Sequence, residues 1–158
     1  MIEIAVNLIV VVVNIFNMIR PATNKDYSSV CDLLASENLP TIDVDRNLSH
    51  FFVKTEQNEI VGSIGMELYG QSALLRSMAV ASGHRSKGIA MALINELMAY
   101  AKGKRVSDMF LITNTAEQYF QRVGFKKIPR EEVKEVVLQS KEFNGLCPAS
   151  SAIMMKEL

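Results

Sequence analysis

The chain has 158 residues, which is enough for one domain with a substantial hydrophobic core. Lys and Arg together number 17, as do Asp and Glu, so the formal net charge is zero and a dedicated nucleic-acid-binding protein is not expected. The two cysteines, Cys31 and Cys147, lie far apart and there are two histidines, so we expect no metal site and a reduced, cytoplasmic setting.

Residues 1–17 are an apolar segment that includes the aliphatic run Leu8 to Val13. A membrane span needs about 20 apolar residues, and Asn7, Asn14 and Asn17 interrupt this segment. It also lacks the basic start and small-residue cleavage site of a signal peptide. We therefore expect an N-terminal extension or an extra strand without stable membrane insertion; a membrane-associating or oligomerising segment is the alternative.

The rest of the chain, residues 18–158, is expected to form a single domain. In its first half, alternating apolar residues predict strands at 19–23, 50–56, 59–70 and 73–80. The second and third of these strands are joined at Gln57 and Asn58 and predict a hairpin. A helix is expected from Tyr27 to about Asn38 because its apolar residues recur at helical spacing, and residues 39–47 are expected to form a loop or a short helical turn.

The second half alternates between helices and strands. A helix begins after Gly88 and carries one apolar face, formed by Ile89, Leu93, Ile94, Leu97, Met98 and Ala101. Further on, the pattern predicts a strand at 108–114, helices at 115–125 and 130–143, and a final strand at 152–155. Hairpins followed by this alternation predict an α+β protein with a mostly antiparallel mixed sheet and a βαβ unit in its middle.

A loop with two glycines and two cations, at Gly83, Arg85, Lys87 and Gly88, lies between the strand and the long helix. A turn at this place can direct several backbone N–H groups at one anion, while an ordinary turn with solvated cations is the alternative. A P-loop is excluded because Ile89 follows Gly88 where lysine is required. The dinucleotide-binding pattern G-x-G-x-x-G is absent.

The pattern Arg85-x-x-Gly88-x-Ala90, shortly after "SMAV", resembles the GNAT family of N-acetyltransferases. That family carries [QR]-x-x-G-x-[GA] at this place and uses it to hold the pyrophosphate of acetyl-CoA. The stretches "MIRPATNKDYSSVCDLL", "EIVGSIGMEL" and "YFQRVGF" resemble further parts of the family in the same order. The C-terminal "KEFNGLCPASSAIMM" is similar to an arsenic-resistance N-acetyltransferase branch, which is itself similar to the acetyltransferase domain of N-acetylglutamate synthases.

The resemblance implies the GNAT-type acyl-CoA N-acyltransferase fold and acetyl-CoA as cosubstrate. It places cofactor binding at Met78, Ala79, Val80, Arg85, Ser86, Lys87, Gly88, Ile89, Ala90, Asn114 and Phe120. Many members carry a tyrosine four residues before the glycine of the "GF" pair, where it protonates the leaving thiolate. This chain has Phe120 there and Tyr119 one residue earlier, about 100° away on a helix, so we expect Phe120 to pack against the cofactor.

Glu67 is the best candidate for a general base because it is a carboxylate in the middle of an apolar strand. Alternatively, it faces solvent or pairs with Arg76. Arg76 is a candidate for binding a carboxylate of the acceptor, with Tyr69 and Cys147 as further substrate-binding candidates. For Cys147, a small buried side chain without a functional role is the alternative.

These features predict an acetyl-CoA-dependent N-acetyltransferase that transfers acetyl directly to the amine of a small, amino-acid-like substrate. The resemblance also implies a connection to arsenic resistance and a homodimer. Because the usual tyrosine is missing, a non-catalytic acyl-CoA-binding module is the alternative.

Overall fold

The computed structural model describes residues 18–158. The expectation of an extension or extra strand at residues 1–17 lies outside the described residues. Within residues 18–158, no helix combines the length and the hydropathy that crossing a membrane would require.

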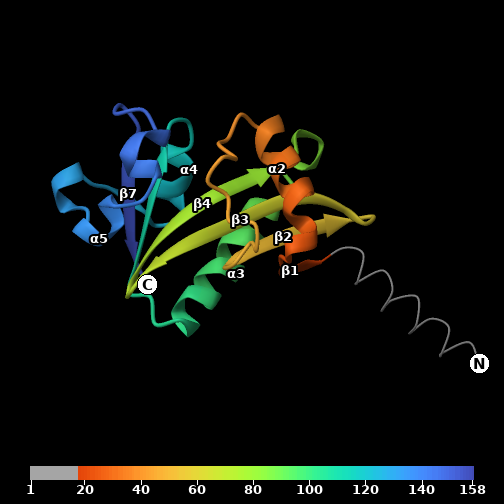
Figure 1. The fold of residues 1–158 in the computed structure, drawn as a ribbon, viewed down its shortest axis with the longest axis horizontal. Helices are drawn as coiled ribbons and strands as arrows, with labels where there is room; N and C mark the ends of the chain where they lie inside the picture. The colour runs from red at the N-terminus through yellow and green to blue at the C-terminus, as the bar shows by residue number, and fades with distance from the viewer. Residues whose placement is uncertain (1–17) are drawn as a thin grey trace, which may run out of the picture.

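Within the described residues, seven strands form one sheet in the order β1-β2-β3-β4-β5-β7-β6 (Figure 1). They are β1 Ile19–Pro21, β2 Phe51–Glu56, β3 Glu59–Tyr69, β4 Ser72–Val80, β5 Asp108–Thr113, β6 Lys126–Lys127 and β7 Ala152–Glu157. Neighbouring strands are antiparallel except for the pair β4 and β5, which is parallel and is connected through a helix. The mostly antiparallel sheet with a central βαβ unit is thus confirmed.

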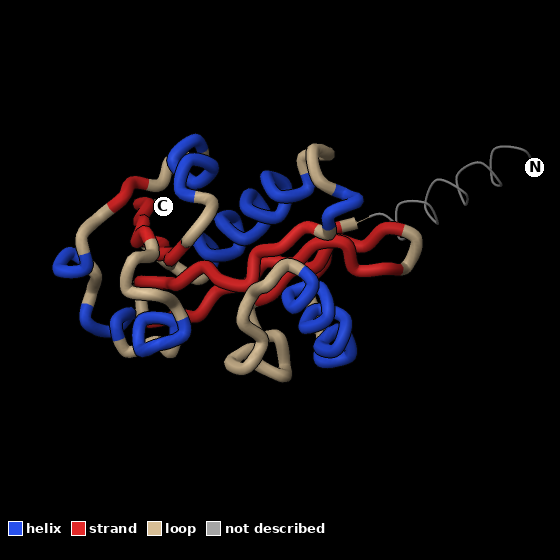
Figure 2. The backbone as a smooth tube through the Cα atoms, turned by 90° about the horizontal axis from the view of Figure 1, so that it is seen from above, coloured by secondary structure: helices blue, strands red, loops and turns tan. Residues whose placement is uncertain are grey.

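Helices cover both faces of the sheet. They are α2 Tyr27–Ser36, α3 Ile89–Gly103, α4 Glu117–Arg122 and α5 Glu135–Leu138. Viewed from above, α3 and α4 lie on one face, while α2 and the segment containing α5 lie on the other (Figure 2). The loop between α2 and β2 runs over this second face.

The largest core cluster lies under α3. All six residues of the apolar face predicted for this helix are buried against β2, β3 and β4. Leu93 and Leu97 are fully excluded from solvent, and burying a leucine side chain contributes about 1.5–3 kcal/mol. This packing fixes the N-terminus of α3 beside the C-terminal end of β4.

On the opposite face, the core is divided into two smaller clusters. One surrounds α2 and includes Val30, Leu34 and Phe51. The other surrounds α5 and includes Phe110 and Val137. The strip of sheet between these two apolar clusters carries polar side chains of β3 and β4, so the division leaves room for a polar site on this face.

The helix predicted at residues 130–143 is wrong. The structure has a 3-10 turn at Arg130–Glu132, the single-turn α5, and a π-type turn at Glu142–Leu146. Val133 and Lys134 have extended backbones, with ψ of 132° and 136°, and interrupt the helical pattern. This interruption lets Val133 and Phe143 join the α5 cluster, so tertiary packing overrides the local pattern.

A β-bulge in β4 shapes the centre of the molecule. Ser63 pairs with Ala79 and Gly65 with Arg76, so two residues of β4 face one residue of β3. Ser77, within the bulge, has a positive φ of 53°, and its carbonyl accepts a 2.9 Å hydrogen bond from the buried Ser63 hydroxyl. Because the bulge adds one residue to β4, the side chains after it lie on the opposite faces of the sheet from those that regular alternation would give.

Strands β4 and β5 also separate along their length. Their parallel pairing covers only three positions, from Ser72 opposite Asp108 to Leu74 opposite Phe110. Beyond Leu74, β4 pairs only with β3 on one side, so its other edge faces an opening next to β5. An opening at the carboxyl ends of parallel strands is a common place for ligand binding in such sheets.

Candidate active site

The loop before α3 presents unpaired backbone N–H groups. Gly88 caps the helix with a left-handed backbone, φ 77°, and Ser86 also has a positive φ of 62°. Ala92 N is the first in this helix to donate to a backbone carbonyl, that of Gly88 at 3.1 Å. The amides of residues 89–91 therefore have no partner within the helix and, together with the positive end of the helix dipole, form an anion-binding position.

The positive side chains of this loop have acidic neighbours. Arg85 Nη2 pairs with Glu37 at the end of α2. Lys87 Nζ lies 4.0 Å from Glu56 Oε2, and His84 Nδ1 lies 2.8 Å from the same oxygen. His84 therefore has an acidic partner, which its position in the sequence did not predict. The two carboxylates offset the repulsion between the loop cations and the helix dipole.

A cavity of about 510 Å³ lies beside this loop, at the opening between β4 and β5. Its lining residues are Met78, Val80, His84, Arg85, Ser86, Gly88, Ile89, Ala90, Met91 and Tyr119. Seven of the eleven residues predicted to bind the cofactor are among them. The sequence did not single out His84, Met91 or Tyr119 for this cavity.

The other four predicted residues do not line the cavity. Ala79 is buried in the α2 cluster on the opposite face. Lys87 is exposed at the loop, and Asn114, just after β5, accepts a hydrogen bond from the Ser151 hydroxyl. Phe120 is buried in the core, where its ring packs edge-on against Phe125 with the centroids 5.5 Å apart.

Tyr119 takes the place at the cavity that was expected for Phe120. Its ring also packs edge-on against Phe120, with the centroids 5.6 Å apart. Burial raises the pKa of Tyr119 above its usual value, so its phenol keeps its proton at neutral pH. The neighbouring helical position therefore brings a tyrosine to the lining of this cavity.

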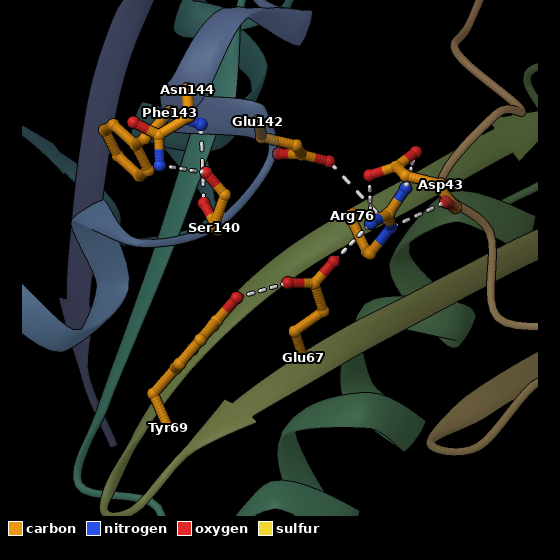
Figure 3. Close-up of polar contacts among 9 residues, drawn as sticks. Asp43, Glu67, Tyr69, Arg76, Ser140, Glu142, Phe143 and Asn144 are labelled. Atoms are coloured by element: carbon orange, nitrogen blue, oxygen red, sulfur yellow. Dashed lines mark hydrogen bonds and ion pairs between the residues drawn. The ribbon is translucent and has the colours of Figure 1, made fainter.

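On the other face of the sheet, a buried guanidinium gathers three carboxylates (Figure 3). Arg76 is 5% exposed, and its Nη1 and Nη2 each donate a 2.6 Å hydrogen bond to one oxygen of Asp43. Nη1 also donates to Glu67 Oε1, and Nε lies 3.9 Å from Glu142 Oε1. The two terminal nitrogens of Arg76 already bind Asp43, so they are not free to form the same bidentate pair with a substrate carboxylate.

The strand register explains why Arg76 and Glu67 meet. Gly65 lies opposite Arg76 and Leu74 lies opposite Glu67, which places both side chains on the same face of the sheet. Tyr69, two residues further along β3, donates its hydroxyl to Glu67 Oε2. The structure thus contains the Arg76–Glu67 pair that the sequence left open, and both oxygens of Glu67 accept hydrogen bonds.

Sequence reasoning missed Asp43 and Glu142. Asp43 comes from the loop after α2 and its side chain is 2% exposed, while Glu142 comes from the π-type turn near the C-terminus. Asp43 belongs to no motif, and Glu142 lies within the C-terminal stretch "KEFNGLCPASSAIMM", in which the sequence did not single it out. The one available signal was Arg76 itself, because a cation in the middle of a buried strand requires acidic partners.

The carboxyl group of Glu142 is the most perturbed acid of the site. Burial raises the pKa of Glu142 to about 7; the charge of Arg76 opposes this rise, and the carboxylates of Asp43 and Glu67 add to it. Glu142 therefore changes its charge close to neutral pH. Such a group can accept a proton and return it.

Two smaller cavities meet this cluster. One, of about 240 Å³, is lined by Ile112, Arg130, Glu142, Phe143, Gly145, Cys147, Pro148, Ala149, Ser151 and Ile153. The other, of about 200 Å³, has Asp43, His50, Glu67 and Arg76 among its lining residues. Burial raises the pKa of the Cys147 thiol to about 11, so this residue is a neutral thiol at the first cavity.

The two parts of the site share strand β4. Met78 and Val80 line the large cavity, while Arg76, two residues before Met78, belongs to the carboxylate cluster on the opposite face. One strand thus carries residues of the large cavity and of the carboxylate cluster within two positions of each other. This arrangement suits a reaction between two bound molecules.

Comparison with known proteins agrees with this architecture. A family model described as acetyltransferase (GNAT) domain matches residues 47–127, slightly more than half of the chain. The match includes β2, β3 and β4, the loop with its free amides, α3, and the strand and helix that follow.

Two curated relatives overlap with part of the chain. An uncharacterised N-acetyltransferase of Chlorobaculum tepidum is 29% identical over 86 residues, covering 54% of this chain and 55% of the relative. An acetyltransferase of Sodalis glossinidius is 38% identical over 71 residues, covering 42% of this chain and 50% of the relative. The chain thus spans about half the length of the curated relatives that it matches.

Among solved structures, N-acetylglutamate synthase of Neisseria gonorrhoeae, crystallised with coenzyme A and N-acetylglutamate, has the same fold. The TM-score is 0.77 at 18% identity, and the match covers 90% of this chain and 35% of that enzyme. At this level of identity the likeness establishes the fold alone.

Proposed function

Because the chain belongs to the GNAT family of acetyltransferases, we propose that it transfers an acetyl group from acetyl-CoA to the amine of a small acceptor. The observation that carries this proposal is the pairing of two sites across β4. An anion-binding cavity lies on one side, and a polar cluster with a carboxyl group of pKa about 7 lies on the other.

The large cavity has the chemistry that acetyl-CoA requires. The free amides of residues 89–91 and the side chain of Arg85 suit the pyrophosphate. The edge of β4 that faces the opening offers backbone groups to the pantetheine arm, which contains amides of its own. The apolar side chains of Met78, Val80 and Ile89 surround this path.

The transfer requires a neutral amine and a proton for the leaving thiolate. An acceptor ammonium first loses a proton to a base, and its nitrogen then attacks the thioester carbonyl. The C–N bond forms, the C–S bond breaks, and the thiolate receives a proton. We place proton removal at the carboxylate cluster, where Glu67 was expected to act, and proton donation at the Tyr119 phenol.

For the acceptor, we propose an amino-acid-like molecule in the 240 Å³ cavity. Arg130 and Glu142 border this cavity and offer opposite charges to a zwitterion. Among the described residues, no carboxylate lies within ion-pair distance of Arg130, whose Nη2 donates to the Phe143 carbonyl at 3.3 Å. Arg130, rather than Arg76, is thus the cation available for a substrate carboxylate, and Cys147 lies beside it.

The test is release of coenzyme A from acetyl-CoA in the presence of each member of an acceptor panel. The panel contains the common amino acids, simple alkylamines, and phosphonate and arsenic-containing amino-acid analogues. The analogues are included because the C-terminal segment resembles arsenic-resistance N-acetyltransferases. We expect turnover with at least one amino-acid-like amine, and we expect Arg130→Gln to raise its KM while leaving acetyl-CoA binding unchanged.

A non-catalytic acyl-CoA-binding module is the second candidate, and the burial of Phe120 at the usual tyrosine position favours it. Calorimetry separates the two candidates. Tight acetyl-CoA binding without turnover of any amine would establish the binding module. Absence of acetyl-CoA binding would contradict both.

A further inference from the structure

We propose that Glu142 is the general base of the reaction and that Glu67 is a positioning residue. The assignment rests on the proposed function. It starts from the hydrogen bonds of the two carboxylates that approach Arg76 from different segments, Glu67 from β3 and Glu142 from the π-type turn (Figure 3).

Glu67 is poorly arranged to accept a proton. One of its oxygens accepts from Arg76 Nη1 and the other from the Tyr69 hydroxyl. Protonation would therefore weaken a charge-assisted bond to a buried guanidinium. These bonds hold Glu67 as a fixed negative charge that orients Arg76 and Tyr69.

Glu142 is arranged in the opposite way. Within residues 18–158, no donor forms a hydrogen bond with its carboxylate, and its closest cationic atom is Arg76 Nε at 3.9 Å. Its side chain is 12% exposed and borders the 240 Å³ cavity together with Cys147. Its oxygens can thus accept a proton from a molecule in that cavity without breaking a bond within the protein.

The groups around Glu142 set the pH at which it works. Arg76 on β4 favours the ionised form, while Asp43 from the loop and Glu67 on β3 oppose it. Cys147, next to it along the cavity wall, is a neutral thiol near pH 7 and adds no charge. The balance keeps Glu142 near the midpoint of its titration at neutral pH, where a base can both take up and release a proton.

Glu142 takes part in one proton transfer of the proposed reaction. The acceptor ammonium gives a proton to the Glu142 carboxylate, and the amine nitrogen then bonds to the acetyl carbonyl carbon. As the C–S bond breaks, the nitrogen loses its second proton to solvent, and the coenzyme A thiolate takes a proton from the Tyr119 phenol, which regains one from solvent, so that amide and thiol are formed. Glu142 returns its proton to solvent, and no oxidant, reductant or further reactant is needed.

The experiment compares pH profiles of kcat/KM for acetyl-CoA and the best acceptor of the panel, using the full chain. In the wild type we expect the profile to fall below a pKa of about 7, separately from the limb at higher pH that belongs to the acceptor ammonium. Glu142→Gln should lower kcat/KM at pH 7 by about 100-fold and remove the limb near 7. Acetyl-CoA affinity should stay within about twofold of the wild type.

Three further variants make the comparison specific. Glu142→Asp keeps a carboxylate and should retain an acidic limb with a smaller loss of rate. Glu67→Gln should be slower but retain the acidic limb, shifted to lower pH, because the base is still present and has lost a neighbouring negative charge. Glu135→Gln changes an exposed glutamate on α5 and should match the wild type throughout.

The outcomes distinguish a wrong assignment of Glu142 from a wrong proposed function. If Glu142→Gln keeps the limb near 7, or if Glu67→Gln is the variant that loses its acidic limb, Glu142 is not the base and the proposed function still stands. If the wild type acetylates no amine, the proposed function falls and the assignment of Glu142 falls with it.

Discussion

The two sides of β4 bind charge by different means. On the α3 side, the loop offers backbone amides from one short stretch, and its cations are largely exposed: Arg85 is 58% exposed and Lys87 53%. On the opposite side, the Arg76 side chain is 3% exposed and is held by carboxylates from three separate segments. The first side can accept an anion at little structural cost, whereas the second is part of the core and loses stability when one charge is removed.

The largest expected effect concerns this buried cluster. Arg76→Gln leaves Asp43 buried without its bidentate partner, so we expect the free energy of unfolding to drop by about 3–5 kcal/mol. Urea unfolding at pH 7.5 measures this loss. Arg85→Gln, on the exposed side, is the matched control and should change stability by less than about 1 kcal/mol. Equal losses in the two variants would contradict the contrast between the two sides.

The titration of Glu142 predicts a pH dependence of stability. Its pKa is raised to about 7 in the folded protein, so folding favours the protonated form. This contribution is complete below the pKa of an unfolded glutamate, about 4.3, and is lost as pH rises through about 7. Glu142→Gln has no such titration, so its stability relative to the wild type should rise by roughly 2–3 kcal/mol between pH 5 and pH 8.

Thermal unfolding of both proteins across this pH range measures the difference. Glu135→Gln, at an exposed position, should give a constant difference over the same range. A constant difference for Glu142→Gln as well would show that Glu142 does not titrate near neutral pH in the folded protein.

The glycine loop predicts an effect of intermediate size. Gly88 has a φ of 77°, a conformation that costs an L-amino acid about 1–2 kcal/mol, so Gly88→Ala should either lose that stability or shift the amides beside it. We expect acetyl-CoA to bind about tenfold more weakly in calorimetry. Gly83→Ala lies in the same loop with open space and no left-handed backbone, and should bind like the wild type. Equal affinities in all three proteins would exclude a role for the Gly88 conformation.

The contrast between the two sides also explains what the sequence could predict. The apolar period of α3, the hairpin turn at Gln57 and Asn58, and the glycine loop are local signals, and the structure has all three elements in place. Both turn residues have a positive φ, 48° and 68°, which asparagine tolerates and which matches the twist of a hairpin. The elements on the α3 side, which are formed by contiguous residues, could therefore be predicted from the sequence.

The buried cluster around Arg76 could not be predicted from the sequence, for physical reasons. Glu67 and Arg76 could be named because each is a charge in an apolar strand, but their pairing depends on the exact turn between β3 and β4, which sets Tyr69 opposite Ser72 and Gly65 opposite Arg76. Asp43 and Glu142 arrive from loops whose paths depend on tertiary packing. The same packing replaced the expected helix at 130–143 with short turns.

The smallest expected effect returns to the exposed side. Glu37 pairs with Arg85 and so competes with any anion for that guanidinium. Glu37→Gln should therefore strengthen acetyl-CoA binding by about two- to fivefold at low salt, with a change in stability below about 1 kcal/mol. The gain should shrink at 0.5 M salt, because exposed charges are screened over a few ångströms. Calorimetry at both salt concentrations measures the gain, and weaker binding by Glu37→Gln would instead mean that Glu37 holds Arg85 in the orientation that the anion needs.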